Sequence, residues 1–300
     1  NNSVVPAKFL LGPAGSGKPG PCLTEIRKAL RTNPEGPPLL LLVPKQSTYQ
    51  LERALLSASQ PAGYTRLRVV SFERLADYVF ERLRINRPGT LSAEGRLMVL
   101  RGIIAKRRDE LKLFRASTRL TGFADQLALS IDEFQQHRVS PDQLRAAAAG
   151  VENQGLSLKL HDLAFLLERY SEWQESHGLL DDNAIMAAAC AGLLKGEPSE
   201  KLAEAIWVDG FADLSSQEAA LTAAVGARCG RAVVTFCLDQ TPSACGAGWL
   251  SCWRTVERSY KRCLKEFLAL CGDAPEIEVL SNEGVDGRFA RNPVLSHMAQ

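Results

Sequence analysis

A short apolar segment, Phe9-Leu10-Leu11, runs directly into the glycine-rich stretch Gly12-Pro13-Ala14-Gly15-Ser16-Gly17-Lys18. Glycines at these spacings let the backbone turn tightly and direct its N–H groups toward phosphate oxygens, and the lysine reaches the terminal phosphates. An amphipathic run, Leu23–Leu30, follows. This order of strand, loop and helix predicts a phosphate-binding loop whose candidate nucleotide-binding residues are Gly12, Gly15, Ser16, Gly17 and Lys18.

The loop departs from the phosphate-loop pattern after the lysine, where Ser or Thr is expected and Pro19 stands, followed by Gly20 and Pro21. The missing hydroxyl is the one that holds Mg²⁺ in such loops. Proline has no N–H to donate to phosphate, and it disfavours helical dihedrals at the preceding residue. We therefore expect the helix to begin near Pro21 or Cys22, and the binding of ATP and Mg²⁺ to be impaired.

A second apolar segment, Ala205–Val208, ends in Asp209. In phosphate-loop ATPases an Asp at this place holds Mg²⁺ and is often followed by a catalytic Glu, but Gly210 stands here. Paired with the glycine loop, Asp209 is a candidate nucleotide-binding residue; taken alone, it is equally a strand-end carboxylate. Because the Mg²⁺-binding hydroxyl and the water-activating Glu are both missing, we assign no catalytic residue and no metal ligand.

Strand and helix patterns alternate at both ends of the chain and enclose a middle that is helical. Near-continuous apolar strands between helices indicate a parallel sheet covered on both faces. The predicted strands are Lys8–Leu11, Pro38–Val43, Leu67–Ser71, Ala205–Val208, Ala232–Leu238 and Ile277–Leu280. The predicted helices of the sheet region are Ser47–Ser57, Phe72–Leu83, Ser215–Arg228 and Trp249–Leu270, with Ser215 as N-cap and Glu218 completing a capping box.

From Ser92 to Leu194 the strand patterns disappear. The helices predicted there are Ala93–Phe114, Thr121–Gln136, Pro141–Ala149, Leu156–His177 and Asp182–Leu194. We therefore predict an α/β fold in which a phosphate-loop NTPase sheet is formed by residues 1–91 and 196–300 and is interrupted by a helical insertion domain at 92–195.

Composition bounds the class of protein. Hydrophobic residues make up 45%, charged residues 23%, and the net charge is +2, as in a soluble globular protein, and no apolar run reaches membrane-span length. Eight cysteines include no C-x2-C pair, and the spacings of Cys245, Cys252, Cys263 and Cys271 match no zinc pattern. We expect free thiols in a reducing, cytoplasmic setting. Lacking an initiating Met and a tail after Gln300, the sequence is expected to be a piece of a longer protein.

Five segments follow one another in the order of one known family. They are Phe9–Gly12 with its glycine loop, Leu42-Val43-Pro44-Lys45-Gln46-Ser47-Thr48-Tyr49, Val69-Val70-Ser71-Phe72-Glu73-Arg74-Leu75-Ala76, Lys159-Leu160-His161-Asp162-Leu163 and Val208-Asp209-Gly210-Phe211. The ordered set resembles the N-terminal helicase-like region of the B subunit of the AddAB helicase–nuclease, from about Lys8 to the end of the chain. The ending Asp-Gly-Phe, in place of Asp-Glu, is typical of that subunit.

This resemblance implies a RecA-like, degenerate superfamily 1 helicase fold and a role in processing double-strand DNA breaks for recombination. It implies a partner, the A subunit, which carries the active helicase motor. It also places a nuclease domain, with a cysteine-ligated iron–sulfur cluster, beyond Gln300, so the cysteines of this chain are not its ligands. Family members often keep Thr where this chain has Pro19.

The resemblance further implies contacts with single-stranded DNA after the second strand and near the third. The matching residues are Lys45, Gln46, Ser47, Thr48, Ser71, Phe72 and Arg74. Small polar groups and cations can hold phosphates while an exposed aromatic ring stacks a base. For Phe72 the alternative is a core position at a strand–helix junction. The basic helix at 93–114 is either a track for the DNA backbone or, more simply, a solvated face.

Three functions remain open from sequence. The first is a DNA-binding, catalytically degraded helicase-like module of a helicase–nuclease. The second is a working phosphate-loop ATPase or small-molecule kinase, which would want the hydroxyl that Pro19 replaces. The third is a protein-interaction scaffold that has lost both ligands.

Overall fold

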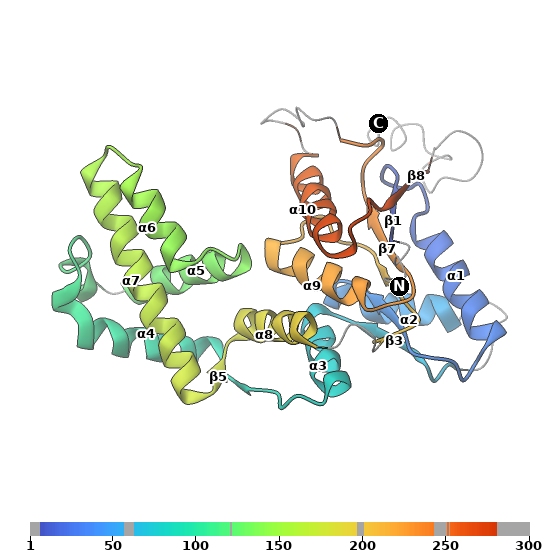
Figure 1. The fold of residues 1–300 in the computed structure, drawn as a ribbon, viewed down its shortest axis with the longest axis horizontal. Helices are drawn as coiled ribbons and strands as arrows, with labels where there is room; N and C mark the ends of the chain where they lie inside the picture. The colour runs from blue at the N-terminus through green and yellow to red at the C-terminus, as the bar shows by residue number, and fades with distance from the viewer. Residues whose placement is uncertain are drawn as a thin grey trace. The chain divides into compact units, whose positions relative to one another are not determined.

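A computed structural model of the chain describes residues 7–56, 63–120, 122–196, 201–242, 251 and 253–280. The described residues divide into two compact units. One combines residues within Asn1–Ile85 and Ala189–Gln300, and the other comprises Asn86–Ala188, which is largely green in Figure 1. The first unit contains the sheet and the second is helical.

All six strands of the main sheet are parallel, in the order β3-β2-β6-β7-β1-β8. Their bounds are β1 Ala7–Leu11, β2 Leu39–Leu42, β3 Leu67–Val70, β6 Ala205–Val208, β7 Ala232–Phe236 and β8 Glu276–Val279. The four leucines of β2 and the whole of β6 and β7 are buried, as expected for strands covered on both faces. The predicted α/β class and parallel sheet are therefore confirmed.

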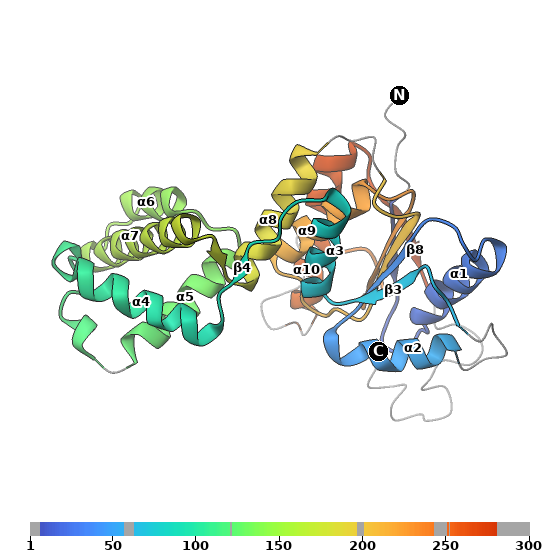
Figure 2. The ribbon, with the colours of Figure 1, turned by 90° about the horizontal axis from the view of Figure 1, so that it is seen from below.

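Helices cover both faces of the sheet, with α1 and α2 on one side and α3, α9 and α10 on the other (Figures 1 and 2). Their bounds are α1 Pro19–Thr32, α2 Thr48–Leu56, α3 Phe72–Leu83, α9 Ser216–Ala227 and α10 Arg254–Cys271. In α1, Cys22, Ile26 and Leu30 recur every four residues, so they form one buried stripe against alternate side chains of the strands, such as Leu39 and Leu41.

The opposite face of the sheet is closed by aromatic packing. Phe9 of β1 meets Phe236 of β7 with ring centroids 5.2 Å apart, and it contacts Tyr260 and Phe267 of α10 at 5.6 and 5.5 Å. The contacts are edge-to-face, the arrangement that aromatic quadrupoles favour. This cluster fixes α10 against the two strands beside the glycine loop.

The first helix begins at Pro19, not near Pro21 or Cys22 as its sequence predicts. Lys18 takes helical dihedrals, φ −42° and ψ −40°, in spite of the proline that follows it. Proline is well suited to a first helical position, because its φ is already helical and its missing N–H has no partner there. That preference outweighs the restriction that Pro19 places on Lys18.

The helical unit has its own core around Tyr170, Leu100 and Ile131, all fully buried. Its elements are β4 Gly89–Thr90, α4 Ala93–Arg107, α5 Phe123–Gln136, α6 Pro141–Ala149, α7 Gln154–His177 and β5 Leu179–Leu180, with 3-10 turns at Arg108–Glu110 and Ser117–Arg119. The helix α8, Asp182–Lys195, crosses the boundary between the two units.

Two sequence-based predictions for the helical unit are wrong in detail. Strands do not disappear entirely, because β4 and β5 form a short parallel pair. The predicted helix Ala93–Phe114 ends at Arg107, because the buried carboxylate of Asp162 draws the following backbone away from helical geometry. It accepts hydrogen bonds from the N–H groups of Lys112, Leu113 and Phe114 at 3.0, 2.8 and 2.9 Å.

Candidate functional site

The carboxyl ends of the parallel strands bring the predicted site residues to one edge of the sheet. The glycine loop follows β1, Lys45 follows β2, Ser71 follows β3 and Asp209 follows β6. Ligands of open α/β sheets gather at this edge. One strand, β7, separates β1 from β6, so the loop and Asp209 are near but not on adjacent strands.

The glycine loop has the backbone that its sequence predicts. Gly15 and Gly17 have φ of 81° and 78°, in the left-handed region that favours glycine. A Cβ at Gly12 would collide with the hydroxyl of Ser16 and lie 3.2 Å from its Cβ, so a side chain at residue 12 would force Ser16 to shift.

The N–H groups of the loop divide into two sets. Those of Gly12, Ser16 and Gly20 donate to the carbonyls of Phe236, Pro13 and Gly17 at 3.2, 3.2 and 2.7 Å. Within the described part of the chain, no hydrogen bond takes up the N–H groups of Ala14, Gly15, Gly17 and Lys18. Successive free amides of this kind form an anion-binding concavity.

The first turn of α1 adds nothing to this concavity. Pro19 and Pro21 have no N–H, and the N–H of Gly20, which lies between them, is already bonded to Gly17. A helix N-terminus normally presents free donors to an anion. The loss of donors caused by the prolines is therefore confined to the helix, and it leaves the loop amides intact.

Lys18 is folded back onto its own loop. Its ammonium donates to the carbonyls of Gly12 and Pro13 at 2.7 and 2.8 Å and lies 3.5 Å from the hydroxyl of Ser16. Burial desolvates the ammonium and lowers the pKa of Lys18, although nearby Cys237 and Asp209 offset part of this shift. A phosphate would have to draw Lys18 away from these carbonyls.

Asp209 is buried and bonded within the sheet. Its carboxylate accepts a hydrogen bond of 2.5 Å from the hydroxyl of Thr235 on β7. Gly210 follows with φ +85°, and a Cβ there would lie 3.2 Å from Pro44. The position that bears a catalytic Glu in active ATPases is thus shaped here for glycine.

These residues fit a phosphate group better than they fit Mg²⁺. The free loop amides and Lys18 supply donors and a cation for phosphate oxygens. For a metal ion, Pro19 supplies no hydroxyl, and one oxygen of Asp209 is engaged by Thr235. Among the described residues no cluster of three or more His, Cys, Asp or Glu side chains could hold a metal.

The predicted DNA-binding residues divide by exposure. Lys45, Gln46 and Arg74 are exposed, Ser47 and Thr48 are half-buried, and Ser71 and Phe72 are buried. Lys45 and Glu73 join the two segments through an ion pair of 3.2 Å, and the hydroxyl of Thr48 donates to the carbonyl of Lys45 at 2.9 Å.

Phe72 packs against Phe211, with ring centroids 5.2 Å apart. Its ring is only 7% exposed, whereas Tyr49, four residues after Lys45, is 71% exposed. Tyr49 belongs to the motif that begins at Leu42, but sequence reasoning assigns it no role. The signal in the sequence is the polar surroundings of Tyr49, because an amphipathic ring among polar neighbours is expected to lie at the surface and not in a hydrophobic core.

The predicted basic helix is partly neutralised. Arg96 and Arg107 of α4 pair with Asp132 and Glu110 at 2.8 and 3.0 Å, and Arg115, beyond the end of α4, pairs with Asp109 at 2.8 Å. This pairing favours a solvated helix face over a track for DNA.

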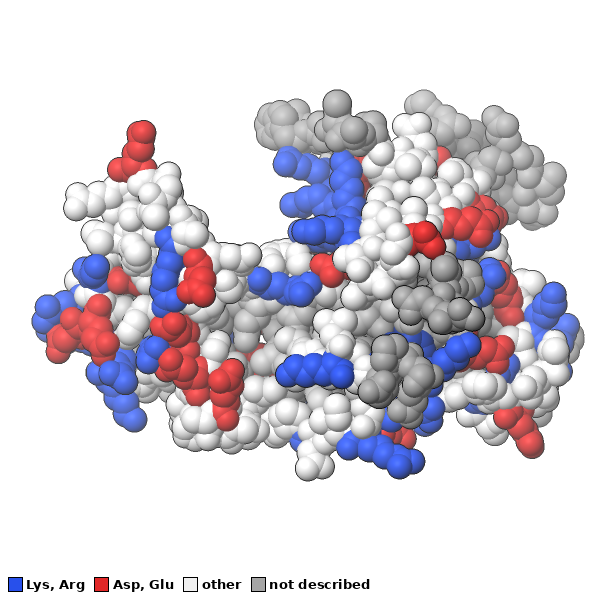
Figure 3. Space-filling model, in the orientation of Figure 1, with Lys and Arg blue, Asp and Glu red and all other residues white. Residues whose placement is uncertain are grey.

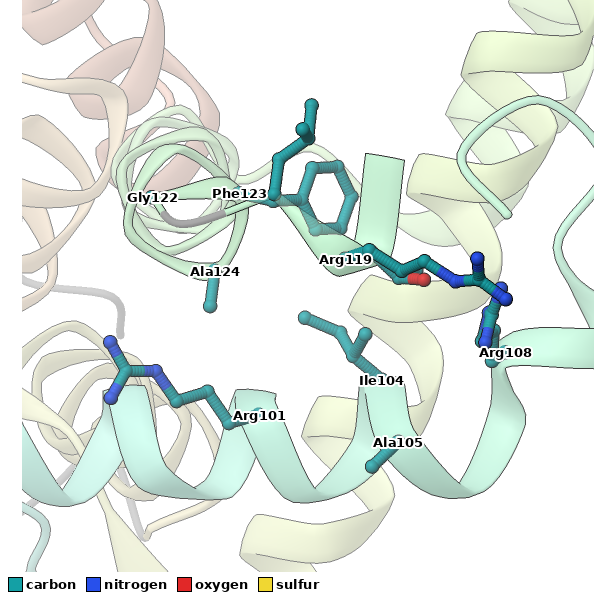
Figure 4. Close-up of a pocket in the computed structure, with 10 residues that line it drawn as sticks. Arg101, Ile104, Ala105, Arg108, Arg119, Gly122, Phe123 and Ala124 are labelled. Carbon is teal, nitrogen blue, oxygen red and sulfur yellow. The ribbon is translucent and has the colours of Figure 1, made fainter. Parts of the chain in front are cut away.

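A cavity of about 490 Å³ lies in the same unit (Figure 4). Three arginines, Arg101, Arg108 and Arg119, line it together with apolar side chains that include Ile104 and Phe123. Arg101 lies 3.7 Å from Asp125, and Arg108 donates to the carbonyl of Arg115 at 3.3 Å. The cavity belongs to the helical unit alone and contains none of the predicted site residues.

The cysteines are consistent with their predicted state. Among the described residues, Cys22, Cys190, Cys229, Cys237, Cys263 and Cys271 form no disulfide, and Cys245 and Cys252 lie outside the described residues. No helix in the described ranges is long and apolar enough to cross a membrane.

Fold and site together define an α/β protein with a glycine-rich loop at the carboxyl edge of a parallel sheet. The family model described as "ADDB, N-terminal" matches residues 9–299 of this chain. The chain belongs to this family, as its sequence predicts.

Curated relatives agree with this assignment. The chain is 35% identical over 298 residues to the B subunit of the ATP-dependent helicase/deoxyribonuclease of Pelotomaculum thermopropionicum, covering 97% of this chain and 25% of the relative. Proteins of the same description from Heliobacterium modesticaldum and Symbiobacterium thermophilum are 39% and 34% identical, over 78% and 97% of this chain and 19% and 25% of theirs. The chain thus spans about a quarter of the length of these relatives.

Proposed function

We propose that this chain is the N-terminal helicase-like module of a helicase–nuclease subunit, that it binds single-stranded DNA, and that its ATP site is degenerate. The description of the relatives as the B subunit of an ATP-dependent helicase/deoxyribonuclease supports this proposal. From the resemblance described for the sequence, we further propose that the module acts in processing double-strand DNA breaks for recombination, in the cytoplasm, beside an A subunit that carries the active motor. The fold is then RecA-like, with residues 92–195 as its helical insertion.

The observation that carries the DNA proposal is the group of exposed side chains at the ends of β2 and β3. Arg74 supplies a cation for phosphate, and Lys45 supplies a second one if it exchanges its exposed ion pair with Glu73 for a phosphate. Gln46 supplies a polar contact, and Tyr49 supplies an exposed ring on which a base can stack. Ser47, Thr48 and Ser71 are close to these residues in the sequence. Phe72 is buried and packs against Phe211. We call Lys45, Gln46, Tyr49 and Arg74 the edge surface.

The degenerate ATP site adjoins the edge surface. The N–H of Asp209 donates to the carbonyl of Leu42 at 3.0 Å, and Gly210 lies against Pro44, the residue before Lys45. In an active motor this connection would link nucleotide state to DNA contact. Here position 19 lacks the Mg²⁺-binding hydroxyl and position 210 lacks the catalytic Glu. The connection between the nucleotide site and the edge surface therefore remains, but the chain alone does not hydrolyse ATP.

The other two candidate functions make different predictions. A working ATPase or kinase requires turnover of ATP, and a scaffold binds neither ATP nor DNA. The free amides of Ala14, Gly15 and Gly17 argue against a scaffold, since such a concavity has no use in packing.

A fluorescent single-stranded oligonucleotide titrated with the 300-residue chain tests the DNA proposal. We expect Tyr49→Ala to weaken binding roughly 5- to 100-fold, because stacking contributes about 1–3 kcal/mol per base. Lys45→Gln with Arg74→Gln should weaken it further at low salt. The matched control is Leu56→Ala, an exposed apolar position about 10 Å further along the same helix as Tyr49. Unchanged affinity in the edge variants, or no binding by the wild-type chain, would contradict the proposal.

A further inference from the structure

The last helix of the sheet unit, α10, has one buried face and one basic face. Tyr260, Cys263 and Phe267 are buried, and the two rings contact Phe9 of β1. Hydrogen bonds add to this anchorage, because the hydroxyl of Ser259 accepts from the N–H of Leu214 at 2.9 Å and Arg262 donates to the carbonyl of Leu214 at 2.8 Å. Packing and hydrogen bonds therefore hold the inner face of α10 against the rest of the sheet unit and leave its outer face exposed.

Four cations occupy that outer face. They are Arg254, Arg258, Lys261 and Lys265, all exposed. Their spacings of four, three and four residues place them in one row along the helix. Figure 3 shows the basic side chains gathered over α10. We call these four residues the α10 basic row.

The row gathers, on one helix face, four cations that have no carboxylate partner in the described part of the chain. Many exposed cations elsewhere in the described residues are paired, for example Arg68 with Glu81 at 3.1 Å and Arg115 with Asp109 at 2.8 Å, and unpaired ones such as Lys28 and Lys106 lie on separate helices. Across the described ranges, no ion pair involves Arg254, Arg258, Lys261 or Lys265. Even on α10, Arg262, which stands beside the row, pairs with Asp213 at 3.4 Å.

Such a row is unfavourable for the helix by itself. Like charges three or four residues apart repel one another and destabilise the helix that carries them. A bound polyanion would remove this repulsion. The row extends over about 16 Å at 1.5 Å per residue, which is the axial length of about five phosphates along one DNA strand.

The topology directs the row toward the edge of the sheet that carries the site. Because β7 and β8 are parallel, α10 must run back along the sheet between them, so its Arg254 end starts at the carboxyl edge. A DNA strand bound at that edge of the sheet can continue along the α10 basic row.

We propose that the α10 basic row binds the sugar–phosphate backbone of DNA, independently of sequence, as a second contact beyond the edge surface; this inference rests on the proposed DNA-binding function. Charge complementarity and spacing identify the phosphate backbone as the occupant. The row offers four cations and no ring at its surface, so it contributes affinity and salt dependence without reading bases.

The test compares two variants of the 300-residue chain with equal loss of charge. The first carries Arg254→Gln, Arg258→Gln, Lys261→Gln and Lys265→Gln. The control carries Lys28→Gln, Arg53→Gln, Lys106→Gln and Lys201→Gln, all exposed cations for which the described part of the chain shows no ion pair. Binding of fluorescent duplex and single-stranded oligonucleotides is measured between about 50 and about 300 mM salt, and circular dichroism checks that both variants are folded.

The expected result is a smaller dependence of log Kd on log salt in the first variant only. Loss of four phosphate contacts should reduce the slope of log Kd against log salt by about 3.6 if the row binds duplex DNA, and by about 2.8 if it binds a single strand. The size of the change therefore identifies which form of DNA the row binds. A slope equal to that of the control would overturn the inference. The edge-surface variant Tyr49→Ala is run beside it: if Tyr49→Ala weakens binding while the α10 variant does not, only this inference fails, and if neither DNA form binds the wild-type chain, the proposed function fails as well.

Discussion

The hydroxyl of Thr235 donates a hydrogen bond of 2.5 Å to the carboxylate of Asp209, across the adjacent ends of β7 and β6. Both side chains are buried. One oxygen of Asp209, a predicted nucleotide-binding residue, is therefore engaged in joining the ends of two strands of the sheet.

Removing this hydrogen bond should destabilise the sheet unit. We expect Thr235→Val, which keeps the shape of the side chain, to lower the free energy of unfolding by about 1–3 kcal/mol, because it leaves a buried carboxylate oxygen without a donor. Urea denaturation measures the change. Thr235→Ser keeps the hydroxyl and should lose less; equal losses in the two variants would show that packing, not the hydrogen bond, matters.

Restoring the residue after the lysine should improve nucleotide binding. Pro19→Thr adds both an N–H and a hydroxyl to the start of α1, where the N–H of Gly20 is already bonded to Gly17 and the two prolines have none. We expect ATP with Mg²⁺ to bind about tenfold more tightly, as one added charge-assisted hydrogen bond would give. Hydrolysis should remain negligible, because Gly210 supplies no base. Isothermal titration and a phosphate-release assay measure the two quantities, and Pro19→Ala, which restores the N–H alone, separates the effect of the N–H from that of the hydroxyl; brisk hydrolysis by Pro19→Thr would refute this prediction.

Glycine at position 210 is required by the backbone. With φ of +85° and Pro44 close to where a Cβ would lie, we expect Gly210→Ala and Gly210→Glu to be destabilising by about 1–2 kcal/mol, and the Glu variant to gain no ATPase activity. Gly20→Ala is the matched control, since it lies in α1 at negative φ with open space around it, and it should be neutral or stabilising. Full stability of Gly210→Glu would contradict the strain argument.

The buried thiols predict how stability depends on pH. Burial raises the pKa of Cys22, Cys229 and Cys263 to about 12, from 9.0. Between these values the unfolded chain loses protons that the folded chain keeps, so the free energy of unfolding falls as pH rises above about 9. Each thiol contributes about 1.4 kcal/mol per pH unit, and Lys18, whose pKa is lowered, opposes them only in part.

Urea denaturation at about pH 8 and about pH 10 measures this effect. Cys229→Ala should reduce the difference between the two pH values, because one of the thiols whose pKa is raised by burial is removed. A free energy of unfolding that is the same at both pH values would show that these thiols ionise as readily in the folded chain as in the unfolded one.

The larger elements of the fold follow from local sequence. The bounds of α3 and α6 match their periodic patterns, and the capping box of Ser215 and Glu218 forms as predicted. The order of the six strands could not be read from the chain, because parallel pairing depends on contacts between distant segments. The early end of α4 could not be predicted from local sequence either, because it depends on Asp162, which accepts a hydrogen bond from the N–H of Lys112, 50 residues away.

The candidate site shows the same division. The left-handed turns at Gly15 and Gly17 follow from residue type. The hydrogen bond from Thr235 to Asp209 and the return of Lys18 to its loop do not, because each arises from tertiary packing. For Phe72 the sequence left two alternatives open, and the structure agrees with the core position at the strand–helix junction. The α10 basic row was visible as a spacing of cations, but only the structure shows that it lacks carboxylate partners in the described residues.

The most direct test is to measure DNA binding and ATP turnover in the same sample of wild-type chain. A fluorescent single-stranded oligonucleotide reports binding by anisotropy, while released phosphate is followed with ATP and Mg²⁺ present. We predict saturable DNA binding with phosphate release no faster than in a Lys18→Ala, Asp209→Asn control. Phosphate release well above that control, or the absence of DNA binding by a folded chain, would contradict a DNA-binding module with a degenerate nucleotide site.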